Sequence, residues 1–167
     1  MKTITITHNE LETAAKRGSK AFLQVFIDKY LQAIDGNLNA ETLTLLNGHQ
    51  NTLLAFHYLR EEVNVGGFVQ LIQNGYGGYI FQNPLAKTMK LYGAHKLSKL
   101  IYNAHEIYSR RREELEKERE EEELTDIYVE FEEFDELDEE FFRIEDNETK
   151  FIAHYVDEHI GDFAEII

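Results

Sequence analysis

Apolar side chains recur every three or four residues over most of this chain. Phe22, Phe26 and Tyr30 show the spacing clearly, between Gly18 and Gly36. Side chains at such intervals share one face of an α-helix. The pattern predicts helices over residues 9–17, 19–34, 39–59 (as one helix, or as two divided at Gly48), 68–73, 84–93, 94–124, 137–144 and 149–163, with glycines or the single proline at several of the breaks.

Two segments do not read simply as helices. Thr3–Thr7 alternates polar and apolar residues as a strand does, but it is short and shows no obvious partner. Residues 126–134 fit the two-residue period of a strand and the 3.6-residue period of a helix. Ile127 and Phe131, for example, are four residues apart, which is two strand repeats or about one helical turn. Strand, helix and loop all remain open for residues 126–134.

The fold class predicted is all-α, with a single compact multi-helix domain and at most a minor extended element. Residues 1–39 are expected to form an N-terminal arm and helices that pack on a main helical domain over residues 40–167. The predicted core contains the following apolar and aromatic side chains: Phe26, Leu54, Phe56, Phe68, Leu71, Leu97, Ile101, Phe141, Ile152 and Tyr155.

Composition narrows the classes of protein that fit. The 167 residues include no cysteine, which excludes a disulfide scaffold, thiolate catalysis and a cysteine zinc site. No apolar run reaches the length of a membrane span, and the N-terminus has no signal-peptide pattern, so a cytoplasmic protein is expected. The formal charge of −15 argues against direct binding of nucleic acid or an anionic membrane.

The negative charge is concentrated in one part of the chain. Residues 113–148, called here the acidic segment, hold 20 acidic and three basic side chains. The charged end of the helix predicted over residues 94–124 should project into water, because its apolar stripe ends at Tyr108. A solvated acidic face is the ordinary explanation for such a run, and an interaction surface is the functional one.

The sequence offers little support for catalysis. None of the seven histidines has a spacing that favours a metal site, and no nucleophile or phosphate-binding motif is present. We therefore expect no metal, no cofactor and no enzymatic activity. A hydrolase that uses His154 and Asp157 is an alternative that requires these residues to converge in a pocket with a bound metal.

Residues 62–75 combine paired glycines with polar residues of turns: Glu-Val-Asn-Val-Gly-Gly-Phe-Val-Gln-Leu-Ile-Gln-Asn-Gly. Asn64 can cap a helix, and Gly66 and Gly67 permit a tight turn before Phe68 enters the core. Two further polar side chains complete the structural motif, Gln70 beside the turn and Asn74 at the next helix end. A structural role explains these residues, and none of them requires a ligand.

This motif resembles the signature of a bacterial family of DNA-mimic proteins. Supporting features follow it: Gly93-Ala94-His95 before a long helix, the acidic run from Phe134 to Phe142, and Tyr155-Val156 in a terminal helix. The resemblance covers roughly residues 40–163. Val65, Leu71-Ile72 and Asn74-Gly75-Tyr76 depart from the family pattern, and they bear on which partner is bound rather than on the fold.

The resemblance implies an all-helical, often dimeric protein whose carboxylates stand in for phosphates on the basic DNA-binding face of another protein. That partner would be a transcription regulator or another DNA-binding protein, with an immunity-type inhibitor of a toxin or nuclease as the alternative. The acidic surface predicted to contact it consists of Glu120, Glu121, Glu122, Glu123, Asp126, Glu130, Glu132, Glu133, Asp135, Glu136, Asp138 and Glu139.

Overall fold

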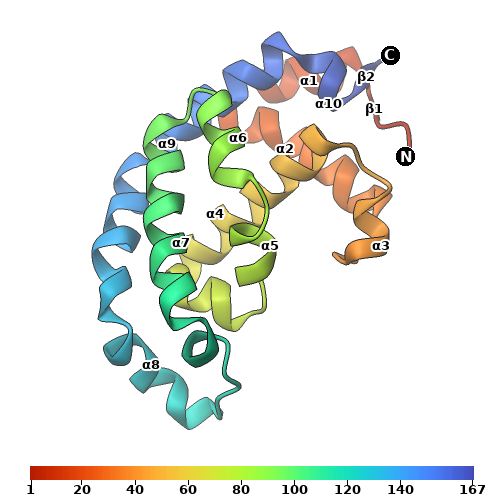
Figure 1. Cartoon of the computed structure of the whole chain (residues 1–167). Coiled ribbons are helices and arrows are strands. Elements are labelled where there is room, and N and C mark those ends of the chain that lie inside the picture. The colour runs from red at the N-terminus through yellow and green to blue at the C-terminus, as the bar shows by residue number, and fades with distance from the viewer. The chain divides into compact units, whose positions relative to one another are not determined.

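The computed structural model describes residues 1–167 and confirms the all-α fold. Ten α-helices, two short 3₁₀ helices and one pair of two-residue strands make up the chain (Figure 1). The residues form two compact units, and α4 and α9 each contribute to both. None of the helices has the length and apolar composition that a membrane span requires. The boundary between residues 39 and 40 stays a prediction.

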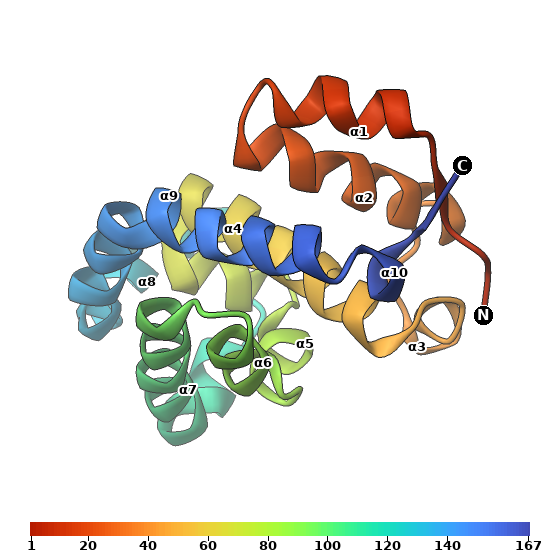
Figure 2. The same ribbon diagram turned by 90° about the horizontal axis from the view of Figure 1, so that it is seen from above.

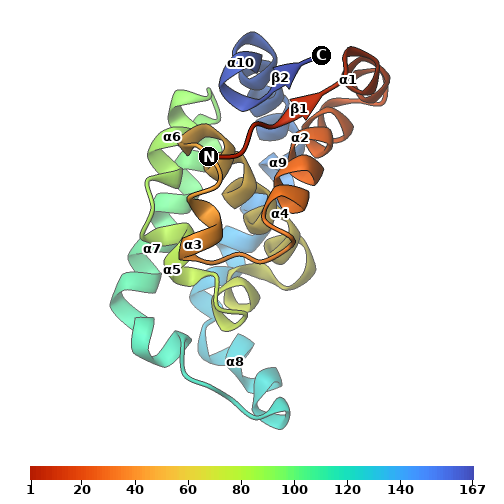
Figure 3. The same ribbon diagram turned by 90° about the vertical axis from the view of Figure 1, so that its right-hand side faces the viewer.

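Unit 1 comprises residues 1–57 and 149–167. It contains β1 (Thr5–Ile6), α1 (His8–Ala15), α2 (Ser19–Ala33), α3 (Ala40–Leu43), the start of α4 (Gly48–Gln73), the end of α9 (Asp135–Glu158), α10 (Ile160–Phe163) and β2 (Glu165–Ile166). Helices α1 and α2 form a hairpin around Gly18, whose φ is +111° (Figure 2). Strand β1 pairs in parallel with β2, so the strand-like start of the chain has a partner that the sequence did not reveal (Figure 3).

Phe163 lies at the centre of the core of unit 1. Its side chain is fully buried and makes edge-to-face contacts with Phe26 and Tyr155, with ring centroids 6.4 Å apart in both cases. The Tyr30 hydroxyl and the Gln50 amide both donate to the Phe163 carbonyl at 3.0 Å. These two bonds satisfy a carbonyl near the end of α10 that would otherwise be buried without a partner.

Unit 2 comprises residues 58–148. It contains the rest of α4, then α5 (Gly77–Phe81), α6 (Leu85–Leu91), α7 (His95–Leu115), η1 (Glu121–Glu123), α8 (Leu124–Glu130), η2 (Glu132–Phe134) and the start of α9. Phe68 stacks on Phe134 at 5.9 Å and contacts Phe81 at 6.4 Å, and Phe81 in turn contacts Tyr108 at 4.9 Å. This row of buried rings joins α4, α5, α7 and η2 into one core.

Local sequence signals placed several helix ends correctly. Asn39, where a helix was predicted to start, caps α3 in a capping box with Thr42, and α4 begins at Gly48, where a break was one of the two alternatives. Gly93, with φ of +87°, ends the helix that follows Pro84. Residues 126–134 are helical, divided between α8 and η2.

The structure differs from the prediction at several places. Helix α7 ends at Leu115 instead of reaching residue 124, because Leu115 is fully buried and the Gln73 amide donates to the carbonyls of Leu115 and Lys117. The helices predicted over residues 137–144 and 149–163 are joined in one continuous helix, α9, since no glycine or proline interrupts it. Helix α9 ends at Glu158, and the last residues of the second predicted helix form the separate helix α10. Helix α5, which begins with two glycines, was not predicted.

Candidate functional site

The acidic segment, residues 113–148, is folded and lies entirely in unit 2. Apolar side chains that are at most 1% exposed recur along it at intervals of three to twelve residues: Leu115, Ile127, Phe131, Phe134 and Phe141. The carboxylates between them face solvent, apart from a few that are partly or fully buried. Because these anchors pack in the core, the segment presents its charge on a defined surface and not on a disordered tail.

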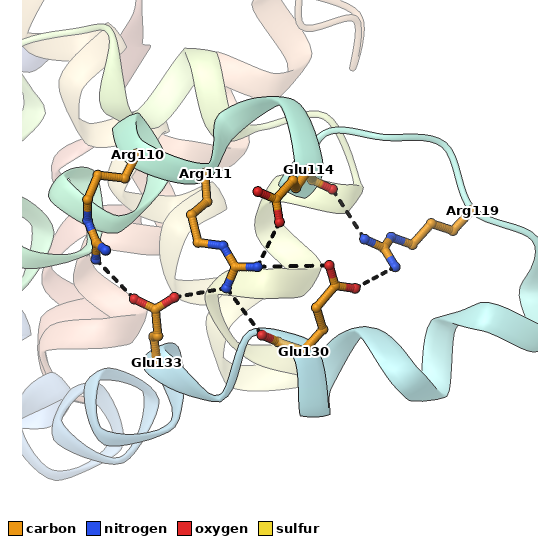
Figure 4. A network of polar contacts seen from close by, with 6 residues as sticks. All are labelled: Arg110, Arg111, Glu114, Arg119, Glu130 and Glu133. Atoms are coloured by element: carbon orange, nitrogen blue, oxygen red, sulfur yellow. Dashed lines mark hydrogen bonds and ion pairs between the residues drawn. The ribbon is translucent and has the colours of Figure 1, made fainter.

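Two of the predicted surface residues, Glu130 and Glu133, pair with arginines of the same unit (Figure 4). Glu133 accepts from Arg110 Nη2 at 3.0 Å through one oxygen and from Arg111 Nη1 at 2.9 Å through the other. Glu130 accepts from Arg119 Nη1 at 2.9 Å. These two carboxylates therefore join α7 and the following loop to α8 and η2.

Arg111 has the largest number of contacts in this network. Its Nη2 donates to the Glu114 carboxylate at 2.7 Å, and its Nη1 donates to the Glu130 carbonyl at 3.2 Å (Figure 4). The residue leaves helical geometry, with φ of −121° and ψ of 21°, and so kinks α7 where the guanidinium turns toward α8. Its guanidinium carbon lies 4.2 Å from the ring centre of Phe131, within the range of a cation–π contact.

The pairing changes the electrostatics of the groups involved. Hydrogen bonds from Arg111 and Arg110 lower the pKa of Glu133. Hydrogen bonds to Glu114 and Glu133 raise the pKa of Arg111. Both shifts favour the charged forms of Glu133 and Arg111, and the carboxylates of the network are already engaged with cations.

Asp138, also predicted to contact a partner, forms a hydrogen bond to the glycine turn. Its Oδ1 accepts the backbone N–H of Phe68 at 2.9 Å, so it caps the second half of α4 from α9. Burial raises the pKa of this carboxyl to about 6; the Phe68 N–H opposes the shift and Asp135 adds to it. The turn lies directly against it, because a Cβ added to Gly67 would sit 2.3 Å from Asp138 Oδ2.

The structure accounts for the other residues of the motif within unit 2. Gln70 and Asn74 both donate to the Glu62 carboxylate, at 3.2 and 2.7 Å, which ties the two sides of the turn together. Gly67 has φ of +74°, as the predicted turn requires. The cap predicted for Asn64 is wrong: its side chain is exposed, and Asp138 caps the helix.

Most of the remaining acids of the predicted surface are exposed and unpaired. Glu120 and Glu123 bond to each other's backbone in a capping box around η1. The others make no ion pair or hydrogen bond through their carboxylates, and we call them the free carboxylates: Glu121, Glu122, Asp126, Glu132, Asp135, Glu136 and Glu139. They extend from η1 through α8 and η2 into the first turns of α9.

Sequence reasoning missed the basic residues that organise this surface. Arg110, Arg111 and Glu114 were not among the predicted site residues, although the run Arg110-Arg111-Arg112 directly precedes the acidic segment. Such a run next to many carboxylates is a signal for intramolecular ion pairs. Glu114 lies within helical spacing of Arg111, but the other partners are up to 23 residues away, so those pairs were not predictable from helical spacing.

The alternative site at His154 and Asp157 lies in unit 1. Both residues line an open groove of about 260 Å³ together with Ser19 and Lys150, so they do share one face. His154 pairs with Glu158 at 3.4 Å, and no hydrogen bond joins it to Asp157 or Ser19. The groove thus shows no hydrogen-bonded nucleophile and base of the kind that nucleophilic catalysis uses. Nowhere do three or more His, Cys, Asp or Glu side chains gather in a way that could hold a metal ion.

Comparison with known proteins identifies the family. A family model described as DMP19-like protein matches residues 44–159, a range that includes the glycine turn and the whole acidic segment. The chain is also 30% identical over 162 residues to the DNA mimic protein DMP19 of Neisseria meningitidis serogroup B (strain ATCC BAA-335 / MC58). That alignment covers 93% of this chain and 94% of the relative. The chain therefore belongs to the DMP19-like protein family.

Proposed function

We propose that this chain is a DNA mimic that occupies the basic DNA-binding face of a DNA-binding protein, such as a transcription regulator. The free carboxylates carry the proposal, because they are solvent-exposed, unpaired and held on a folded unit. The name of the Neisseria relative supports the same role. The role involves no catalytic step and no cofactor, and a cytoplasmic location is part of the proposal.

The density of charge suits this role. Asp135, Glu136 and Glu139 occupy the first turns of α9, over about 6 Å of helix axis at 1.5 Å per residue. The mean spacing is therefore about 3 Å per charge, close to the 3.4 Å per charge along one strand of duplex DNA. Glu132 in η2 adds a further exposed carboxylate directly before them. Lysines and arginines that bind phosphates could pair with these carboxylates instead.

The first experiment identifies the partner. The tagged full chain is used to capture proteins from a native lysate of its own source, and proteins that elute with rising salt are identified. A DNA complex of the recovered protein is then titrated with this chain while release of labelled DNA is followed. The proposal requires release of the DNA. Simultaneous binding of DNA and this chain, with no loss of affinity for either, would refute mimicry.

A pair of variants assigns the effect to the free carboxylates. The test variant replaces four of them with amides: Glu132→Gln, Asp135→Asn, Glu136→Gln and Glu139→Gln. The control replaces four exposed, unpaired acids of unit 1 and so changes the net charge equally: Glu41→Gln, Asp157→Asn, Asp162→Asn and Glu165→Gln. We expect the test variant to lose affinity at least about tenfold and the control to bind nearly as the wild type does. Equal losses in both would attribute binding to net charge alone.

A further inference from the structure

Two arginines enclose the ring of Phe131 within the acidic segment. The guanidinium carbons of Arg111 and Arg119 lie 4.2 and 5.7 Å from the ring centre, and the ring itself has no exposed surface. Arg111 belongs to the kinked end of α7, Arg119 to the loop before η1, and Phe131 to the end of α8. We call these three residues and Glu130 the arginine clamp. It connects three pieces of backbone at a single point.

Arg119 differs from an ordinary surface arginine. Its side chain is only 13% exposed, and its Nη1 donates to Glu130 at 2.9 Å (Figure 4). Its Nη2 donates to the backbone carbonyl of Glu114 at 3.3 Å, near the end of α7. An enclosed guanidinium with one bond to α7 and another to α8 restrains both, whereas a solvated ion pair restrains little.

The surroundings of Arg119 explain why such a restraint is needed. It is preceded by Glu118 and followed by the four glutamates of residues 120–123. Like charges this close repel one another, and the repulsion favours an extended loop. Without a cation inside the fold, the loop and α8 would separate. The free carboxylates on η1 and α8 would then lose their fixed places.

We propose that Arg119, together with Arg111, is a positioning group for the acidic surface: it holds residues 116–134 in one arrangement so that a basic partner meets a preformed pattern of carboxylates. The effect on partner binding rests on the proposed function, whereas the restraint of residues 116–134 does not. A preformed surface loses less conformational entropy on binding, which raises affinity without a new contact.

The direction in which one substitution changes the affinity for the partner distinguishes positioning from an effect of net charge. Arg119→Gln makes the chain more negative by one unit, so attraction by net charge alone would strengthen binding to a basic face. Positioning makes the opposite prediction, since the loop would open. Arg143→Gln is the matched control: Arg143 lies in the same segment, its side chain is 75% exposed, and its ion pair with Glu140 stays within α9.

The experiment uses the full chain as wild type, Arg119→Gln, Arg119→Lys and Arg143→Gln. Hydrogen–deuterium exchange measures the opening of residues 116–134 without any partner, and circular dichroism confirms that each variant is folded. We expect amide exchange in this segment to rise at least about tenfold in Arg119→Gln and to stay unchanged in Arg143→Gln. Arg119→Lys should be intermediate, because lysine keeps the charge but not the planar two-sided donor.

Affinity is then measured for the DNA-binding protein identified in the capture experiment. Weaker binding by Arg119→Gln, with unchanged or tighter binding by Arg143→Gln, supports the proposal. Unchanged exchange in Arg119→Gln overturns it, and so does faster exchange combined with unchanged or tighter binding. The amide variant of the free carboxylates tests mimicry separately, so its failure would not be mistaken for failure of the clamp.

Discussion

Replacement of Gly67 with alanine tests how the turn inside α4 supports the acidic segment. Gly67 combines φ of +74° with ψ of −175°, a region that is essentially restricted to glycine. An added Cβ would lie 2.3 Å from Oδ2 and 2.7 Å from Cγ of Asp138. The carboxylate cannot withdraw freely, because Oδ1 caps the N–H of Phe68 at 2.9 Å. The substitution therefore strains the backbone and displaces a helix cap.

The two effects can be estimated separately. A non-glycine residue in this region costs about 1–3 kcal/mol. Loss of a helix cap costs about 1 kcal/mol. Together they predict that Gly67→Ala lowers the free energy of unfolding by about 3 kcal/mol, or the melting temperature by roughly 6–12 °C for a chain of this length.

Urea unfolding followed by circular dichroism measures the loss. Gly75→Ala is the matched control, because Gly75 also has a positive φ of +88° but has no atom within 4 Å of an added Cβ. It should lose only the free energy that its own positive φ costs an alanine. The double variant Gly67→Ala/Asp138→Ala removes the clash but leaves the strain and the missing cap. If Gly67→Ala is as stable as Gly75→Ala, the close approach to Asp138 has no energetic role and the reasoning is wrong.

Two further predictions concern buried carboxylates of unit 2. Burial raises the pKa of Asp138 from 3.8 to about 6. Between these pH values the folded chain holds a proton that the unfolded chain has lost, so the free energy of unfolding falls as the pH rises. A shift of about two units corresponds to at most ~3 kcal/mol, and we expect about 1–2 because the side chain is partly solvated. Asp138→Asn should therefore exceed the wild type in urea unfolding at pH 7.5 and match it near pH 4; equal pH dependence in both would contradict this. Glu148, which is 2% exposed, accepts the N–H of Leu97 at 2.9 Å. Glu148→Ala should therefore lower the free energy of unfolding by about 1–3 kcal/mol in the same urea assay, and Glu148→Gln should lower it less. Equal losses in the two Glu148 variants would show that this hydrogen bond does not stabilise α7.

The sequence predicted those parts of the fold that depend on neighbouring residues. The helix start predicted at residue 39 depends on a capping box of Asn39 and Thr42 that spans three residues, and the turn at Gly67 needs a conformation that glycine alone adopts easily. Such signals are local, because the side chain and the backbone group it serves are close in the chain. Helix starts and glycine-containing ends could therefore be located without the structure.

Long-range partners explain what the sequence could not provide. The Phe68 N–H is capped by Asp138, which lies 70 residues away in the sequence. Helix α7 ends at Leu115, whose carbonyl accepts from the Gln73 amide, 42 residues earlier in the sequence. The charged residues after Leu115 have adequate helix propensity, so propensity alone would have continued the helix. Only a packed core determines which distant side chain meets which backbone group.

The candidate site illustrates the same limit for charge. Counting carboxylates treats all 20 acids of the acidic segment alike, although Glu130 and Glu133 pair with arginines and Asp138 caps a helix. Two free carboxylates a few ångströms apart repel by about 1 kcal/mol even in water, and a dense surface contains many such pairs. Duplex DNA holds its phosphates in place covalently, whereas a protein must oppose this repulsion with non-covalent contacts. Arg111 and Arg119 reduce the net negative charge of the surface. Through the arginine clamp, however, they also oppose the repulsion that would otherwise move the remaining carboxylates apart.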